Sequence, residues 1–181
     1  MTHMSYGKTA RALDLRTLGH QRIEAFKVFN DLTQGVKKRH PVYSMWDGYE
    51  FSLGIYTMMM CMEWVNHRGC ADKIFYKVYR IIEEIKRNDH RFTYVEPPWL
   101  KDKAVLRSHR SNLLRRENDG VIAGENYFRA FGSIDDDWPY IWPIIDLDEG
   151  YVLKISKVDR ERLQNGERHL PSNVKKRIVN L

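Results

Sequence analysis

Apolar residues recur at helical spacing through most of the first 117 residues, and this periodicity constrains the fold more than any other feature of the chain. It predicts a first helix from an N-cap at Thr9 to about Leu32, ended by Gly35. The apolar stripe of this helix consists of Leu15, Leu18, Ala25, Phe29 and Leu32. Gly19 costs roughly 1 kcal/mol against alanine within a helix, which is tolerable if another backbone approaches closely there.

Three further helices are predicted over about 47–66, 71–87 and 101–117. Segment 47–66 is apolar on most sides, which indicates a central helix. Segment 71–87 is amphipathic, and its inward face consists of Ile74, Val78, Ile81 and Ile85. We expect Gly69 to end the helix over 47–66.

The second half of the chain is less regular. A short helix is expected around 125–131, an acidic turn at 135–137 and a short strand over 151–155. Pro139 and Pro143 argue against a regular element between residues 138 and 143. The expected fold class is therefore all-α: a compact helical domain over 1–143 with an irregular aromatic loop, and an appendage over 144–181 that packs on this domain or extends from it.

Charge is unevenly distributed along the 181 residues, which fit one domain. The net charge is +6 and the calculated pI is near 9.3, a balance that points to an acidic partner such as nucleic acid. Residues 1–40 and residues 151–181 each carry eight basic against three acidic residues, and 101–116 carries six against one. These three segments could assemble a basic groove.

The cysteines and the longest apolar run bear on location. Cys61 and Cys70 match no metal or redox spacing, so we expect reduced thiols in a cytosol, with Cys61 as a small core residue. The run from Leu53 to Met62 is too short to span a bilayer, and the amino terminus lacks a signal pattern. We therefore expect a cytoplasmic monomer that does not associate with membranes.

Segment 101–117 carries the densest set of candidate binding groups. Arg107, Arg110, Ser111 and Arg115 share one helical face, and His109, Asn112 and Arg116 occupy the neighbouring face. Guanidinium, imidazole, amide and hydroxyl groups bind phosphate oxygens and base edges. The alternative is a solvated face with incidental charge, but such a face usually mixes signs, and residues 101–116 contain a single acid.

Two residues near the amino terminus are candidates for chemistry. Glu24 lies between His20 and Lys27 on a polar stripe, either as an ion-pair partner or as an acid that protonates a leaving base or stabilises positive charge on a sugar. Thr2 is small, which favours removal of Met1 and leaves a free α-amine. Such an amine has a pKa of about 7.7–8.0 and can form Schiff bases with sugars.

Other chemistries find little support in the sequence. The histidines form no His-x-x-x-His pair, and there is no glycine-rich phosphate loop and no Gly-x-Ser-x-Gly elbow. We therefore expect no metal site.

Several blocks of sequence occur together in an order that is fairly specific. They are Leu13-Asp14 through Leu18-Gly19-His20-Gln21-Arg22-Ile23-Glu24, His40-Pro41, Met45-Trp46-Asp47-Gly48-Tyr49, Glu63-Trp64, Arg68-Gly69, Pro97-Pro98-Trp99-Leu100, Ser108-His109-Arg110-Ser111-Asn112-Leu113-Leu114-Arg115-Arg116 and Tyr140-Ile141-Trp142-Pro143. With these blocks the chain resembles the pyrimidine-dimer DNA glycosylase (endonuclease V) family, most closely its bacterial branch. The resemblance covers about residues 10–143, and residues 144–181 have no counterpart in it.

The resemblance implies a DNA repair enzyme of a bacterial or phage-infected cell that acts on pyrimidine dimers without metal or organic cofactor. The Thr2 amine would attack C1′ of the sugar with help from Glu24, and the resulting imine would permit strand cleavage by β-elimination. Recognition would involve kinking of double-stranded DNA and extrusion of a base. The expected DNA contacts are His20, Arg22, Lys27, His40, Arg107, His109, Arg110, Ser111, Asn112 and Arg115.

Two alternatives to this function remain open at the level of sequence. The first is a DNA-binding protein of the same fold that is not catalytic. The second is a glycosylase that acts on another modified base.

Overall fold

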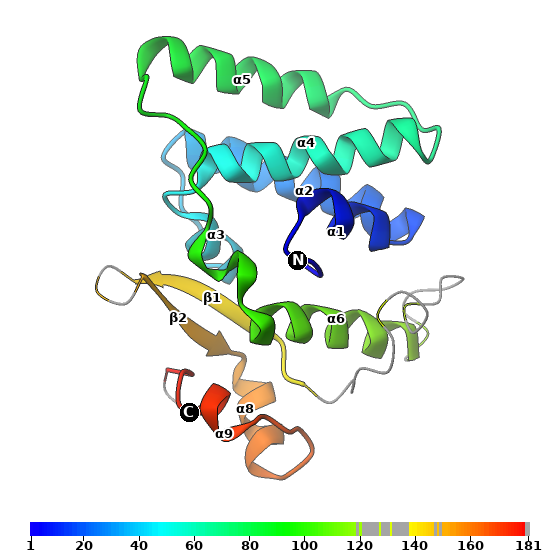
Figure 1. Ribbon diagram of the computed structural model, residues 1–181, viewed down its shortest axis with the longest axis vertical. Coiled ribbons are helices and arrows are strands. Elements are labelled where there is room, and N and C mark those ends of the chain that lie inside the picture. The colour runs from blue at the N-terminus through cyan, green and yellow to red at the C-terminus, as the bar shows by residue number, and fades with distance from the viewer. Residues whose placement is uncertain are drawn as a thin grey trace. The chain divides into compact units, whose positions relative to one another are not determined.

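The computed structural model describes residues 1–118, 120, 127, 131, 138–146, 148 and 150–179. Most of these are helical, as expected, but the all-α prediction is incomplete because two strands form a small sheet (Figure 1). The predicted acidic turn at 135–137 and most of the predicted helix at 125–131 lie outside the described residues. The chain divides into two compact units, Ser5–Pro97 and Met1–Met4 with Pro98–Leu181.

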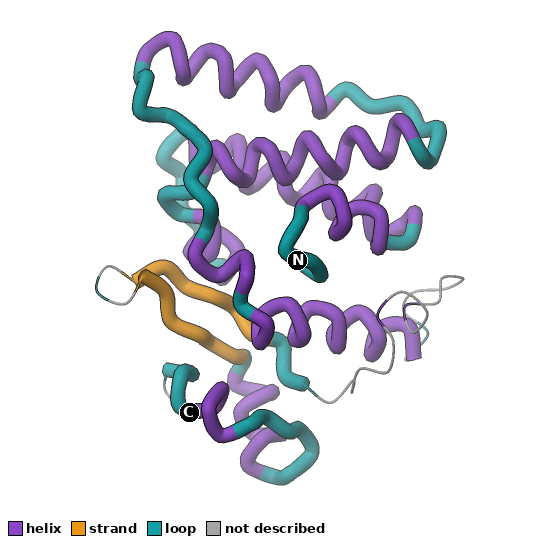
Figure 2. Tube along the Cα trace, viewed as in Figure 1, coloured by secondary structure: helices purple, strands orange, loops and turns teal. Residues whose placement is uncertain are grey.

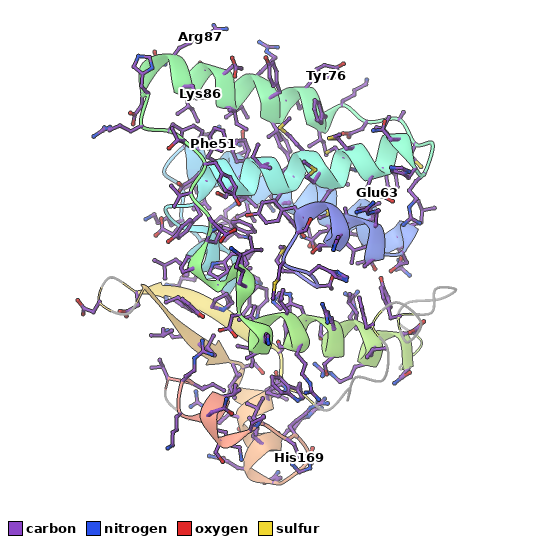
Figure 3. All side chains as sticks on the ribbon, in the orientation of Figure 1. Phe51, Glu63, Tyr76, Lys86, Arg87 and His169 are labelled. Carbon is purple, nitrogen blue, oxygen red and sulfur yellow. The ribbon has the colours of Figure 1, made fainter. Side chains whose placement is uncertain are left out.

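The unit Ser5–Pro97 is a helical bundle. Its elements are α1 (Tyr6–Ala12), α2 (Leu15–Thr33), α3 (Pro41–Trp46), α4 (Glu50–Asn66) and α5 (Ile74–Asn88). Helix α4 packs against α1, α2 and α5, and its Leu53, Tyr56 and Met60 are buried (Figure 1). The prediction of a central helix is thereby confirmed. Helix α5 covers one side of α4, and Figure 3 shows its Tyr76 on the outside, where the residue is 70% exposed.

The first predicted helix is wrong in one respect, since the structure has two helices there. Ser5 caps α1, and Thr9 is buried inside that helix instead of capping it. The chain is extended at Leu13 and Asp14, and the Asp14 carboxylate accepts the N–H of Thr17 at 2.8 Å to begin α2. Because of this break Leu15 is 46% exposed, whereas the rest of the predicted stripe is buried.

The other helix boundaries of this unit shift by a few residues for local reasons. Helix α4 begins at Glu50 instead of Asp47, because Gly48 adopts a φ of +79° that a helix cannot contain. Helix α5 begins at Ile74, where the Asp72 carboxylate accepts the N–H groups of Ile74 and Phe75. Cys61 is a buried free thiol, as expected.

The second unit is built on α6 and a hairpin. It contains the 3₁₀ helix η1 (Pro98–Lys101), α6 (Lys103–Asn118), strands β1 (Ile141–Asp146) and β2 (Gly150–Ile155), and helices α8 (Lys157–Gln164) and α9 (Ser172–Lys175) (Figure 2). The strands pair antiparallel, with Ile141 opposite Ile155. One buried cluster draws on α6, both strands, α8, α9 and the segments beside them: Ala104, Val105, Trp138, Ile141, Leu153, Ile155, Leu163, Leu170, Val174 and Ile178.

Strand β1 overturns the prediction that prolines exclude a regular element at 138–143. Pro143 lies opposite Leu153 in the hairpin. The backbone groups of Leu153 bond instead to Arg177 and Val179 on the far side of β2, so this pair exchanges no hydrogen bonds. The missing N–H of Pro143 is therefore not required, and proline is tolerated in a strand with a free edge. The predicted strand over 151–155 is confirmed as β2.

Candidate functional site

Helix α6 carries the candidate binding groups, and the structure divides them between its buried and accessible sides. Asp102 begins the helix by accepting the N–H of Ala104 at 2.8 Å. Ser108, His109 and Ser111 are buried, because β1 and the first residues of the chain pack on this side. The Ser108 hydroxyl accepts the N–H of Ile141 at 2.6 Å, which fixes the start of β1 on α6.

The start of the chain lies against this buried side of α6. The Met1 amino group forms a hydrogen bond with Nδ1 of His109 at 2.8 Å. One residue further on, the guanidinium Nε of Arg110 donates to the carbonyl oxygen of Thr2 at 2.5 Å. The structure thus brings together two segments that were singled out separately, Met1-Thr2 and the Ser-His-Arg-Ser-Asn block.

Burial changes the protonation of both partners in this contact. The pKa of the Met1 amine falls from 8.0 to about 5, because the surrounding protein disfavours its charged form. The pKa of His109 falls well below its usual value, through burial and through the neighbouring amino group. At neutral pH both groups are therefore uncharged, and an uncharged amine has the lone pair that a nucleophile needs.

Aromatic rings surround the His109 imidazole. The ring centroid of Tyr140 lies 4.8 Å from that of His109, and the ring of Trp142 lies 6.0 Å away, both edge to face. The Tyr140 hydroxyl also lies 3.4 Å from Nδ1 of His109. These contacts hold the imidazole in one orientation, so the position of the amine beside it is well defined.

The arginines of α6 make contacts within their own unit. The guanidinium of Arg107 lies over the Trp138 ring, 4.6 Å from its centroid, and that of Arg110 lies 5.8 Å from the Phe131 centroid. Arg115 donates to the Ser111 hydroxyl at 3.0 Å and to the carbonyl of Trp138. The predicted shared face of Arg107, Arg110, Ser111 and Arg115 is therefore partly internal, since Ser111 is buried and each arginine also contacts a neighbour.

Helix α2 presents the other predicted group of site residues. His20, Glu24 and Lys27 are exposed and follow one side of the helix at spacings of four and three residues. Arg22 differs from them, because its guanidinium forms an ion pair with Asp72 and lies 4.8 Å from the Trp64 ring centroid. Its side chain is 12% exposed, and that of Asp72 is 1% exposed.

The predicted contact residue His40 has a structural task at the start of α3. Its Nδ1 accepts the N–H of Val42 at 3.2 Å, so the imidazole caps this helix, and the residue is exposed. In the loop before α3, Lys37 forms an exposed ion pair with Asp47 at 2.7 Å. Part of the basic charge of the loop before α3 is thus neutralised locally.

The sequence did not reveal several residues that shape these sites. Asp72 is the partner of Arg22, and Asp102 binds both Tyr151 and Arg177. Asp72 is fifty residues from its partner, and Arg177 is seventy-five from Asp102, so no local pattern connects them. The alternation of Tyr140, Ile141 and Trp142 was the available signal for a strand, but the flanking prolines outweighed it.

The described residues also bear on metals and membranes. In this part of the chain, no group of three or more histidine, cysteine, aspartate or glutamate residues is arranged to hold a metal ion. None of the helices described above is both long and apolar enough to cross a membrane.

The fold and the site define a mostly helical, basic protein whose first residues are held against an arginine-rich helix. A family model described as pyrimidine dimer DNA glycosylase matches residues 1–82. This match confirms the family resemblance over residues 1–82. The matched part includes Thr2 and Glu24 but not α6. Searches of curated proteins and of solved structures give no match.

Proposed function

We propose that this protein is a DNA glycosylase with abasic-site lyase activity that acts on pyrimidine dimers in double-stranded DNA. The observation that carries the proposal is the position of the first two residues against α6, where Met1 contacts His109 and the Thr2 carbonyl accepts a hydrogen bond from Arg110. Burial there lowers the pKa of the Met1 amine to about 5, and the proposal assigns the same effect of burial to the Thr2 amine once Met1 is removed, since an uncharged amine is the form that attacks a sugar carbon. The family match over residues 1–82 supports DNA as the substrate.

The nucleophile in the proposed reaction is the α-amine of Thr2 after removal of Met1. Its nitrogen forms a bond to C1′ of the deoxyribose, the glycosidic bond breaks, and the base leaves with the bonding electrons and takes up a proton. Loss of a proton from the nitrogen and opening of the sugar give an imine. Removal of a C2′ proton then expels the 3′ phosphate by β-elimination.

Two further groups have roles in this proposal. Arg110 holds the Thr2 carbonyl and so limits where the amine can lie. Glu24, exposed on α2, supplies the carboxylate that protonates the leaving base or stabilises positive charge on the sugar. Lys27 and His20 contact DNA phosphates beside it. Arg22 is assigned to DNA binding by the resemblance, although its guanidinium already pairs with Asp72.

Borohydride trapping tests the proposal, since borohydride reduces an imine to a stable amine and leaves the protein attached to DNA. Two preparations are compared on dimer-containing duplex, one shown by mass to begin at Thr2 and one with an acetylated amino terminus. We expect an adduct only from the first. Glu24→Gln should lower strand cleavage by about 100-fold or more, whereas Glu84→Gln, an exposed substitution on α5, should leave it unchanged.

Other outcomes of the same experiment would replace the proposal. If protein that begins at Thr2 gives no adduct but binds DNA with an affinity that falls steeply as salt rises, it is a non-catalytic DNA-binding protein. If adducts form on another modified base while dimers are spared, the lesion is a different one.

A further inference from the structure

Ile23 lies on the outward side of α2, and 52% of the residue is exposed. The apolar residues that pack this helix into the bundle are buried, among them Leu18, Ala25 and Phe29. A helix turns about 100° per residue, so Ile23 lies roughly 140° around the helix from Leu18 and roughly 160° from Ala25. Its side chain therefore points away from the core of the unit Ser5–Pro97.

Exposed cations surround Ile23 on this side of the unit. Arg16 and Lys27 are on α2 itself, seven residues before and four residues after Ile23, spacings that place all three on one helical face. Helix α5 adds Lys77, whose ammonium lies 5.9 Å from the ring centroid of Phe26 on α2. Among the described residues, none forms an ion pair with Arg16, Lys27 or Lys77. These cations are therefore available to the phosphates of a nucleic acid.

Glu24, the proposed catalytic carboxylate, is the residue after Ile23 and is exposed like it. Chemistry on a nucleotide inside a duplex requires that nucleotide to leave the base stack. Proteins promote unstacking with an apolar side chain inserted between bases, since such a group fills the gap without requiring hydrogen bonds. Single exposed apolar residues are common, so exposure alone assigns no role to Ile23. Its position assigns one, because cations that would hold the DNA backbone flank it and the carboxylate that would react is next to it.

We propose that Ile23 is inserted between stacked bases when α2 binds duplex DNA, and that it thereby exposes the target nucleotide to Glu24. This role rests on the proposed function, which supplies duplex DNA as the ligand. A protein partner fits this surface less well, because the centre of a protein interface is depleted of charged residues. Within α2, which is described in full, the other exposed large apolar residue is Leu15. Leu15 lies seven residues before Arg22 and therefore shares the side of Arg22, not that of Ile23.

Fluorescence of 2-aminopurine measures this unstacking, because the base emits strongly only after it leaves the stack. The probe is a duplex that contains one thymine dimer with 2-aminopurine directly beside it. Protein that retains Met1 is used, so that strand cleavage does not accompany binding. We expect emission to rise on the order of threefold when the protein binds, and Ile23→Ala to lose most of that rise. The affinity of Ile23→Ala for undamaged duplex should stay within about twofold, since its phosphate contacts remain.

Two further variants control for side-chain size and for loss of apolar surface in general. Ile23→Leu keeps an aliphatic side chain of equal size and should restore emission to within about 1.5-fold of that of the unsubstituted protein. Leu15→Ala removes an aliphatic side chain of similar exposure, 46%, from the same helix and should leave emission unchanged. Neither Ile23→Ala nor Leu15→Ala should shift the midpoint of urea unfolding, because both positions are exposed.

Equal emission with Ile23→Ala and with the unsubstituted protein would overturn the inserted role of Ile23, and so would equal losses for Ile23→Ala and Leu15→Ala. Light scattering of the protein without DNA tests the other occupant of this surface. A dimer that Ile23→Ala dissociates would show that a second copy of the chain, and not DNA, covers Ile23. The glycosylase proposal fails separately: protein that begins at Thr2 would then give no borohydride adduct, even though emission depends on Ile23.

Discussion

The amino group of Met1 forms a hydrogen bond with His109, a residue 108 positions further along the chain, and both groups are uncharged in the folded protein at neutral pH. Burial is the main cause for each, since desolvation penalises an ammonium and an imidazolium alike. The start of the chain is therefore part of the core of the second unit. Because both pKa values are lower in the folded protein than in the unfolded chain, stability should rise with pH.

The free energy of unfolding of protein that retains Met1 should increase as pH rises from about 5 to about 8. The pKa of the amine is 8.0 when unfolded and about 5 when folded, so the unfolded chain binds more protons in this range and stability rises with pH. His109 contributes with the same sign below its unfolded value of 6.5. Urea unfolding at pH 5.5 and pH 8.0 should show a gain of roughly 2–4 kcal/mol at the higher pH. A chain extended at its amino terminus, with the amine in solvent, serves as the control and should gain less.

Asp72 should be among the most sensitive polar positions of the unit Ser5–Pro97. Its carboxylate pairs with Arg22 and accepts the first N–H groups of α5 while only 1% of the side chain is exposed. Asp72→Ala would leave the Arg22 charge unmatched, so we expect a loss of roughly 2–4 kcal/mol in urea unfolding. Lys27→Gln, on the exposed side of α2, should change stability by less than about 0.5 kcal/mol.

Arg22 and Lys27 both lie on α2, but we expect the first to stabilise the fold and the second to bind DNA. Arg22→Gln should lower stability, because it breaks the buried pair with Asp72. Lys27→Gln should weaken DNA binding and reduce its salt dependence without affecting unfolding. If Arg22→Gln leaves the unfolding midpoint unchanged, the pair with Asp72 does not stabilise the bundle.

Gly54→Ala should destabilise the centre of the bundle. A Cβ at this position would lie 2.9 Å from Cδ1 of Ile82, closer than Cβ atoms come to their neighbours in proteins, and 3.0 Å from the ring of Phe29, which is tighter than most contacts. The clash should outweigh the better helix propensity of alanine, roughly 1 kcal/mol, and cost about 1–3 kcal/mol net. Gly7→Ala in α1, where a Cβ would meet no atom within 4 Å, is the control and should be neutral or stabilising.

Asp102 connects the start of α6 to the C-terminal segment, and the stability that these contacts contribute should depend on pH. It accepts hydrogen bonds from Tyr151 at 2.7 Å and from Arg177 at 2.5 Å. Burial alone would raise the pKa of Asp102, but these bonds and the N–H of Ala104 lower it below 3.8. Its contribution should therefore be complete above about pH 4 and decline as pH falls further. Asp102→Asn should cost about 1–2 kcal/mol at pH 7, a modest value because Arg177 is 44% exposed.

The control for this prediction is Asp148→Asn, which removes an exposed carboxylate from the described part of the turn between β1 and β2. Its unfolding free energy should stay within about 0.5 kcal/mol of the unsubstituted protein at pH 7. Equal costs for Asp102→Asn and Asp148→Asn would contradict the proposed role of the network.

Much of the helical architecture could be predicted, because the periodicity of apolar residues reflects burial directly. The central position of α4 followed from the apolar residues on most of its sides, and the buried Val78 of α5 followed from its stripe. The break at Leu13-Asp14 was missed because an aspartate within a helical pattern can be either a surface residue or a cap. Gly19 was expected to admit another backbone, but the neighbour is the side chain of Trp64, which would lie 3.1 Å from a Cβ at this position.

The sequence by itself determined the helical segments, the basic character of α6 and the identity of the candidate residues, since these depend on composition and on spacing within one element. Only the tertiary structure decided that Pro143 can lie in a strand, that Arg22 pairs with Asp72, and that the first residue of the chain reaches His109. Each of these depends on residues ten to more than a hundred positions apart. Such contacts are set by packing, which buries one group only when another part of the chain supplies its partner.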